Sequence, residues 1–337
     1  MADVKLLERL VRRQVMIQRF GGSQIKAALP ALRKLARDLR ERIAGGEATD
    51  FQMGRMVSLE RDVQQLITVA REGIQGQLEL EDFAVEEYQF GQNLLSESVN
   101  VDLGEGVNLD RVRAITTRRR MRLVSGDKVR QMTIPEMWRD FDGAVGRDAM
   151  RVVQAGVLEG KTQQDMAREV AQMVTTRSRR QAESVIRTAV NGIGAAAREQ
   201  VYRDNDDIIE GEKWISTLDG RTSDVCRARD GKIYPVGQGP RPPAHYGCRS
   251  LTAPEIKEQY RLAIKGQRAS KDGPVSNQLT YGGWLKKQPD EFVDDVLGPT
   301  RAKLFREGKV KIDQFVDDSG RTLTLDQLRQ RYNITME

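Results

Sequence analysis

The stretch that decides the fold of the second half covers residues 213–251, KWISTLDGRTSDVCRARDGKIYPVGQGPRPPAHYGCRSL. Asp219-Gly220 and Asp230-Gly231 are strong turn signals, because Gly adopts positive φ without strain and Asp hydrogen-bonds nearby backbone amides. Residues 232–236 are predicted to form a short strand after the second turn. The segment is therefore expected to be a compact module of short strands and tight turns.

The single histidine of the chain and its two cysteines all lie in this stretch. Thiolate and imidazole are preferred ligands of Zn²⁺, and His-x-x-Cys with a more distant Cys supplies three of them. The three candidate ligands are Cys226, His245 and Cys248, and a fourth is expected from water or from a neighbouring aspartate, namely Asp219, Asp224 or Asp230. A zinc ion would cross-link and stabilise this loop-rich segment.

Other interpretations of the three residues remain open at this stage. The cysteines are equally compatible with small buried apolar groups beside a backbone-bonded His245, or with a disulfide formed after release from the cell. Cys, His and Asp are also the parts of a thiol protease, and His with Asp occurs in metal-dependent nucleases. Catalysis is disfavoured because Cys226 follows an Asp-rich turn and the chain has no Gly-rich phosphate-binding loop. We predict a structural site.

Outward from this module, the start of the chain is predicted to be helical. Apolar residues recur at three- and four-residue steps over residues 4–44, with charged residues between them. Gly21-Gly22 is expected to divide this region into two amphipathic helices, with Ser23 capping the second and Gly45-Gly46 ending it.

A third helix is expected to begin at a cap provided by Thr49 or Asp50 and to continue to about Ser98. Helices with one apolar stripe bury it against each other or against another subunit. Both a self-contained bundle and a partner-binding region fit this pattern.

Residues 100–132 have β-branched residues and glycines without a helical period, which predicts a linker with short strands. This segment carries a run of basic residues, Arg118, Arg119, Arg120 and Arg122. Such a run fits contact with DNA or an acidic partner, and it also fits a solvent-exposed face.

The helical period returns over residues 134–202, where three helices are predicted at about 135–159, 162–175 and 178–204. Pro135 suits a first helical turn, and Thr162 with Asp165 forms an N-terminal capping pattern. The third helix has a face of small and aliphatic residues that permits close packing: Ala189, Ile193, Ala196, Ala197 and Val201.

Composition completes the prediction of the fold class. At 337 residues with 39% hydrophobic residues, the chain can bury at least one core. We expect a predominantly helical α+β protein, in which an N-terminal helical region is followed by further helices and a small turn-rich α/β C-terminal module. Two cysteines are too few for a disulfide framework, which fits assembly in a reducing compartment.

Charge and hydropathy bear on the surroundings of the protein. The 55 basic and 49 acidic residues give a net charge of +6, which predicts a mixed surface that tolerates polyanions without coating them. The charged N-terminus lacks the apolar core of a secretory signal, and no stretch approaches the length of a membrane span. We expect a soluble protein made in the cytoplasm.

Several residues of the turn-rich module match a known pattern in order and spacing. The segment resembles the core of phage Mu F-like head morphogenesis proteins, as does Arg187-Thr188 in the preceding helix, although Ala189 stands where an acidic residue is common. The matching residues are Trp214, Ile215, Ser216, Thr217, Leu218, Asp219, Arg221, Thr222, Ser223, Cys226, Asp230, Gly231, Pro242, Pro243, His245, Cys248, Arg249 and Ser250. Within them Asp219 and Arg221, with Arg249, are predicted to fix a turn.

The resemblance extends over residues 135–332, because later residues resemble a tail extension of such proteins: Tyr281, Trp284-Leu285, Gln288-Pro289, Val296-Leu297-Gly298 and Arg301. A capped helix is predicted to follow at 323–332. We therefore expect a helical assembly or portal-interaction region (1–100), a linker with short strands (101–133), the Mu F-like core (134–253) and a C-terminal extension (254–337).

The resemblance implies a minor capsid protein of a tailed bacteriophage, located in the virion head near the portal and in the host cytoplasm during assembly. Its implied partners are the portal protein and other head proteins, with packaged DNA nearby as a non-specific neighbour and with no membrane or small-molecule substrate. It implies no established reaction. A small nuclease- or toxin-like catalytic domain carried on a virion protein, or a DNA-binding module, is the alternative.

Overall fold

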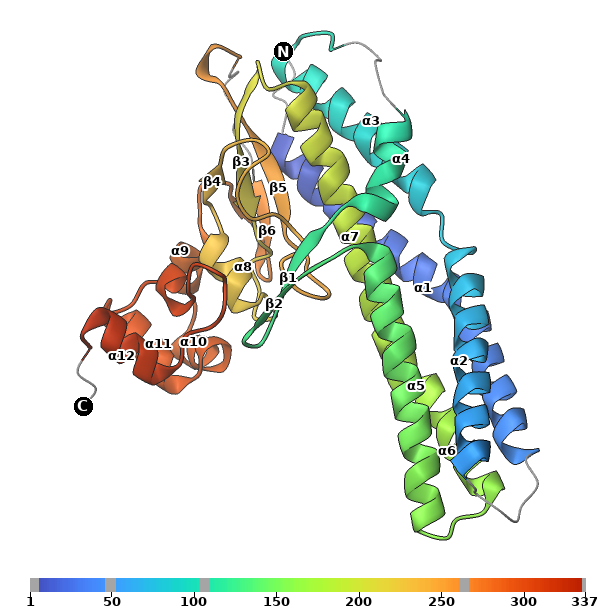
Figure 1. Cartoon of the computed structure of the whole chain (residues 1–337). Helices are drawn as coiled ribbons and strands as arrows, with labels where there is room; N and C mark the ends of the chain where they lie inside the picture. The colour runs from blue at the N-terminus through green and yellow to red at the C-terminus, as the bar shows by residue number, and fades with distance from the viewer. Residues whose placement is uncertain (1–5, 46–52, 104–108, 261–266, 335–337) are drawn as a thin grey trace. The chain divides into compact units, whose positions relative to one another are not determined.

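The computed structural model describes residues 6–45, 53–103, 109–260 and 267–334. The described chain is mostly helical with small antiparallel sheets, which confirms the predicted fold class (Figure 1). The helices are α1 (Leu6–Ala44), α2 (Met53–Gln75), α3 (Leu80–Val99), α4 (Leu109–Arg118), α5 (Ile134–Leu158), α6 (Gln163–Met173), α7 (Arg179–Asp204), α8 (Asp224–Arg229), α9 (Tyr281–Leu285), α10 (Asp290–Leu297), α11 (Pro299–Arg306) and α12 (Leu325–Tyr332). The strands are β1 (Met121–Ser125), β2 (Lys128–Met132), β3 (Ile209–Ile215), β4 (Ile233–Tyr234), β5 (Leu251–Ile256), β6 (Gln267–Ser270) and β7 (Gly273–Ser276).

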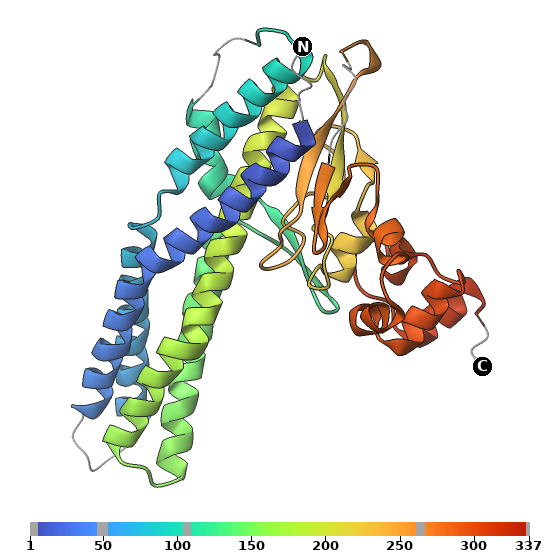
Figure 2. The same cartoon turned by 180° about the vertical axis from the view of Figure 1, so that it is seen from behind.

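The chain divides into two compact units. The bundle unit comprises residues 19–80 and 133–189, and the sheet unit comprises residues 1–18, 81–132 and 190–337. Within the bundle unit, α2 and α5 run side by side, as do α5 and α6 (Figures 1 and 2). The predicted boundaries at 100, 133 and 253 stay predictions.

Residues Leu6–Ala44 form one continuous helix, α1, so the predicted division at Gly21-Gly22 is wrong. The hydroxyl of Ser23 donates to the carbonyl of Phe20 at 2.8 Å inside helix α1, instead of capping a new helix. A glycine costs a helix about 1 kcal/mol relative to alanine, which is less than the gain from a continuous buried stripe. That stripe keeps its phase across the glycine pair: Leu10, Ile17, Ile25, Leu32, Leu39 and Ile43 are all buried.

The prediction of one long helix to Ser98 is also wrong, because α2 ends at Gln75 and α3 begins at Leu80. Gly76 closes α2 with a hydrogen bond from its amide to the Glu72 carbonyl at 2.9 Å. The amide of Glu79 then donates to the buried side chain of Gln24 at 3.1 Å. A helix break held by a residue 55 positions away is invisible to local periodicity. The predicted caps Thr49 and Asp50 lie outside the described residues.

Strands are present in the 101–133 region as predicted, and a helix accompanies them. β1 and β2 pair as an antiparallel hairpin whose two-residue turn places Gly126 at φ 60°. Helix α4 was not predicted. The basic run follows it: Arg118, Arg120 and Arg122 are exposed, whereas Arg119 forms an ion pair with Glu199.

The three helices predicted between 134 and 204 are confirmed as α5, α6 and α7, with a π-helical turn, η1 (Val174–Ser178), joining the last two. Pro135 lies in the first turn of α5, and the Thr162 hydroxyl accepts the amide of Asp165 at 3.1 Å. Thr133 and Glu136 form a full capping box that was not predicted. The predicted small-residue face of α7 is buried.

The central sheet of the sheet unit has the strand order β4-β3-β5 and is antiparallel throughout. The predicted strand at 232–236 is shorter than expected, because Pro235 has no amide proton to continue the ladder. The α7 residues of the sheet unit lie against β5, where the Tyr202 hydroxyl donates to the Thr252 carbonyl at 3.1 Å.

The C-terminal helices of the sheet unit form an apolar cluster of their own around Tyr281, Trp284 and Phe305. Leu218 of the turn-rich module is part of the same cluster, and the Tyr281 and Trp284 rings meet edge to face at 5.2 Å between centroids. The predicted capped helix at 323–332 is confirmed as α12, with a capping box at Thr324. Two short 3-10 turns, η2 (Glu258–Tyr260) and η3 (Ile312–Phe315), complete the described elements.

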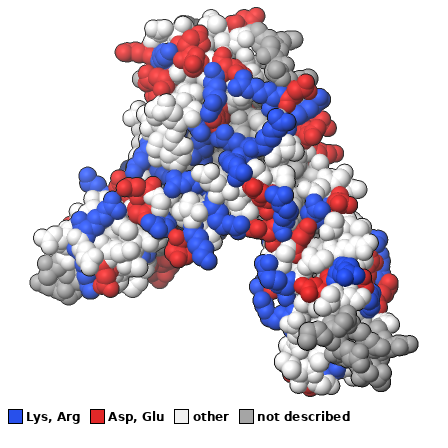
Figure 3. Space-filling model, viewed as in Figure 1, with Lys and Arg blue, Asp and Glu red and all other residues white. Residues whose placement is uncertain are grey.

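Charged side chains of both signs are interspersed on the face drawn in Figure 3, in line with the mixed surface that the composition predicts. Among the described residues, every helix is too short or too polar to cross a bilayer.

One carboxyl group of the bundle unit gives a pH-dependent prediction. Burial raises the pKa of Asp142 to about 6, although Arg71 Nε lies 2.8 Å from one of its oxygens. In the folded protein, Asp142 therefore keeps its proton up to a higher pH than in the unfolded chain, where the pKa of an aspartate is about 3.9. This group therefore stabilises the fold fully below about pH 4 and loses that contribution as the pH rises through about 6.

Asp142→Asn is expected to remove this contribution to the pH dependence. Relative to the native protein, the variant should gain stability as the pH rises from about 4 to about 7, because the native carboxylate must ionise in a buried place. Urea denaturation at intermediate pH values measures the difference. Two curves that stay parallel across this range would contradict the assignment.

Candidate metal centre

Three side chains that are far apart in the sequence of the turn-rich module meet at one point of the sheet unit. Cys226 lies in the first turn of helix α8, and Cys248 lies just before strand β5. The Sγ atom of Cys226 is 3.7 Å from Sγ of Cys248 and 3.4 Å from Nε2 of His245. All three candidate ligand atoms lie within 4.8 Å of one another. The structure thus brings together the three residues predicted as ligands.

The two cysteines are free thiols, not a disulfide. Their separation of 3.7 Å is far longer than the ~2.05 Å of a sulfur–sulfur bond. Both cysteine side chains are buried, and His245 is partly buried. The ring of His245 is oriented by its Nδ1 atom, 2.9 Å from the carbonyl of Tyr246, which leaves Nε2 facing the sulfurs.

Two of the three separations fit a tetrahedral metal ion, and the third, between His245 and Cys248, lies within 4.8 Å. Zinc bonds of about 2.3 Å to sulfur and about 2.0 Å to nitrogen, at the tetrahedral angle, place two sulfurs about 3.8 Å apart and a sulfur and a nitrogen about 3.5 Å apart. The observed 3.7 Å and 3.4 Å lie within 0.2 Å of these values. The buried cluster is therefore able to hold a metal.

Protonation of the cluster is uneven. The hydrogen bond with Cys248, together with burial, raises the pKa of the Cys226 thiol well above its usual value. The same hydrogen bond, assisted by His245, holds the pKa of Cys248 well below its usual value. Burial lowers the pKa of His245, but contact with Cys248 outweighs it and the pKa is raised. One thiolate is thus favoured in the metal-free pocket.

The aspartates predicted as a possible fourth ligand are paired with other groups. Both oxygens of Asp219 accept hydrogen bonds from the guanidinium of Arg249, at 2.7 and 2.8 Å. Asp219 also accepts the amide of Arg221 at 3.0 Å, within the turn that follows it. The Arg221 side chain is 84% exposed, which leaves Arg249 as the principal partner of the carboxylate. Asp224 pairs with Arg227 and with Thr322.

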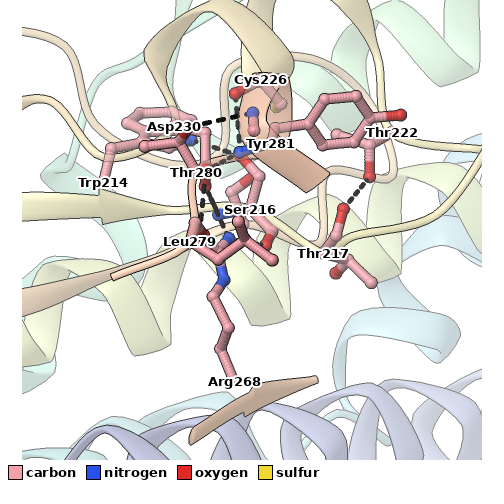
Figure 4. Close-up of polar contacts among 12 residues, drawn as sticks. Trp214, Ser216, Thr217, Thr222, Cys226, Asp230, Arg268, Leu279, Thr280 and Tyr281 are labelled. Carbon is pink, nitrogen blue, oxygen red and sulfur yellow. Dashed lines mark hydrogen bonds and ion pairs between the residues drawn. The ribbon is translucent and has the colours of Figure 1, made fainter. Parts of the chain in front are cut away.

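Asp230 is the centre of a buried ion pair, drawn in Figure 4. Its two oxygens accept from both terminal nitrogens of Arg268, at 2.6 and 2.9 Å, and from the amides of Ser216 and Tyr281, at 2.7 and 2.6 Å. The Asp230 side chain is fully buried and that of Arg268 is 2% exposed. This network joins the turn-rich module to strand β6 and helix α9.

The other motif residues serve the packing around this network. The indole of Trp214 is fully buried and donates to the Ser216 hydroxyl at 2.9 Å, which lies 3.2 Å from the Ser250 hydroxyl. Thr222 donates to the Thr217 carbonyl at 2.6 Å. Three further motif residues have backbone roles: Ser223 is the N-cap of α8, Gly231 has φ 80°, and Pro243 follows a cis peptide bond.

Sequence reasoning did not identify two polar residues that support the site. Asn191, within the small-residue face of α7, donates to the carbonyl of Cys248 at 2.9 Å and accepts from Gln14 at 2.7 Å. A polar amide among the small and aliphatic residues of this helix was the available signal. Arg268 lies in a short polar strand, where nothing local distinguishes it from a surface arginine.

Comparison with known protein families matches residues 149–253 to the family described as Phage Mu protein F like protein. No curated protein and no solved structure matches the chain. The matched range includes the metal-ligand cluster, Asp219, Asp230 and the first half of strand β5, and it ends before Arg268. Residues 149–253 of this chain therefore form a domain of the phage Mu protein F-like family.

Proposed function

We propose that this chain is a minor head protein of a tailed bacteriophage that associates with the portal and acts in head assembly and in DNA packaging or ejection. The observation that carries the proposal is the Mu F-like domain at residues 149–253. The helical bundle unit suits protein–protein assembly, because amphipathic helices readily pack against further helices. A surface of mixed charge is compatible with packaged DNA as a neighbour.

Within this function, the Mu F-like domain serves as architecture, and a zinc ion held by Cys226, His245 and Cys248 staples its turn-rich segment. Two sulfurs and one imidazole form a donor set that favours zinc over hard cations. The site connects α8 to the start of β5, and because the unfolded chain does not hold the three ligands together, the free energy of metal binding stabilises the folded state. The proposed role requires no chemical reaction.

Co-expression with the portal protein of the same phage genome tests the proposal. The full-length chain is expected to elute with the portal oligomer in size-exclusion chromatography and to be present in a few copies in purified virions. The major head protein, co-expressed in place of the portal, is the control and should elute separately. Elution of the chain alone in the presence of the portal, together with its absence from virions, would refute the proposal.

A further inference from the structure

A small cavity lies directly beside the metal-ligand cluster. It is lined by Cys226 and His245 on one side and by polar residues on the other, among them Thr222, Ser223 and Arg249. The cavity leaves about 20 Å³ for the centres of water molecules. Since one water needs roughly 10 to 15 Å³, this half-open space suits a single water or one end of a small linear ligand that extends toward solvent.

The sequence restricts what can complete the coordination of a metal here. The chain has one histidine and two cysteines, and the cluster uses all of them. A fourth ligand of the kinds that zinc usually takes must therefore be an oxygen, from a carboxylate or from water. The carboxylates nearest in sequence are bound elsewhere, because Asp219 is paired with Arg249, Asp224 with Arg227 and Asp230 with Arg268. Moving any of them to the metal would leave an arginine without its partner.

A buried hydroxyl faces the same cavity. Ser223 is the N-cap residue of α8, yet its side chain does not cap the helix. Its Oγ atom is buried and, apart from a weak contact with the Cys226 thiol, has no hydrogen-bond partner in the part of the chain that the structure describes. Buried polar atoms are nearly always hydrogen-bonded to protein or to ordered water. A ligand in the cavity would supply the missing partner.

We infer that the metal centre is open: its fourth coordination position faces this cavity, holds a water that bonds Ser223, and accepts a small monovalent anion in place of that water. The inference rests on the metal site proposed above. Sites with three protein ligands and one exchangeable ligand are the type that binds and polarises external groups, whereas purely structural sites are closed by four protein ligands. The site thus binds small ligands in addition to stapling the loop.

Cobalt substitution with azide as the probe tests the inference on the full-length protein. Co²⁺ reports its ligands through visible absorption, and the thiolate charge-transfer bands show that both cysteines are bound. Azide is expected to shift the absorption bands saturably in a one-to-one complex. Ser223→Ala should weaken azide binding by roughly fivefold, as the loss of one hydrogen bond does. Ser276→Ala, at an exposed serine of β7 outside the cavity, is the matched control and should bind azide normally.

The outcomes separate this inference from the metal assignment. Cobalt bound through two thiolates, with a spectrum that azide does not change, would show a closed site. That result would overturn the inference of an open fourth position and leave the metal site itself intact. Loss of cobalt in an Asp219→Asn variant would identify a carboxylate as the fourth ligand and overturn it as well. Failure of the native protein to bind cobalt or zinc would remove both the metal site and the inference built on it.

Discussion

Cys226→Ser in the full-length protein is expected to abolish stoichiometric zinc binding and to cause a large loss of stability. The serine keeps the size of the side chain but removes one of three protein ligands, and a buried hydroxyl is a poor ligand for zinc. A ligand present at a thousandfold its Kd stabilises a folded protein by about 4 kcal/mol, so the metal-loaded native protein should lose approximately that amount. Elemental analysis and thermal unfolding measure the two effects.

Asp219→Asn is the control for that experiment, because its carboxylate is bound to Arg249 instead of facing the three ligands. It should retain zinc while weakening the turn. Alkylation of the thiols distinguishes the remaining explanations. Unreactive cysteines that become reactive only after reduction would indicate a disulfide, whereas native protein whose stability does not change when a chelator is added would indicate an ordinary buried pair.

Arg268→Met is expected to destabilise the sheet unit by about 3 to 5 kcal/mol, the typical cost of removing one partner from a buried ion pair. The variant leaves the Asp230 carboxylate fully buried, with two backbone amides in place of four hydrogen-bond donors. It also frees the carbonyls of Ser216 and Leu279, which Arg268 bonds in the native protein. The unfolding free energy from urea denaturation measures the loss.

Two further variants make this prediction specific to burial. Arg321→Met removes an arginine whose side chain is 50% exposed beside Asp317, and the cost there should stay within about 1 kcal/mol. The double variant Asp230→Asn, Arg268→Met should be more stable than the sum of the two single losses predicts, because no buried charge remains unpaired. Equal losses for Arg268→Met and Arg321→Met would argue against a buried, structural role for the pair.

Local patterns predicted the elements whose signals lie within a few residues. The helices after Thr133, the turns at Asp219 and Asp230, and the capped helix at Thr324 follow from periodicity, capping and turn chemistry. The two errors in the N-terminal helices share one cause: the deciding interaction comes from a distant residue. Burial of a continuous stripe carries α1 through Gly21-Gly22, and Gln24 supports the start of α3.

The sequence by itself determined the ligand types of the candidate metal centre, because one histidine and two cysteines occur within 23 residues of a turn-rich segment. It also indicated the Mu F-like family, because the spacing of turn and polar residues is a property of the linear chain. Only the tertiary structure decided that the ligand atoms of the three side chains lie within 4.8 Å of one another, that Asp219 pairs with Arg249, and that Arg268 neutralises Asp230. Burial and pairing of charges depend on segments that meet only in the folded chain, and no local pattern encodes which distant arginine will neutralise a buried carboxylate.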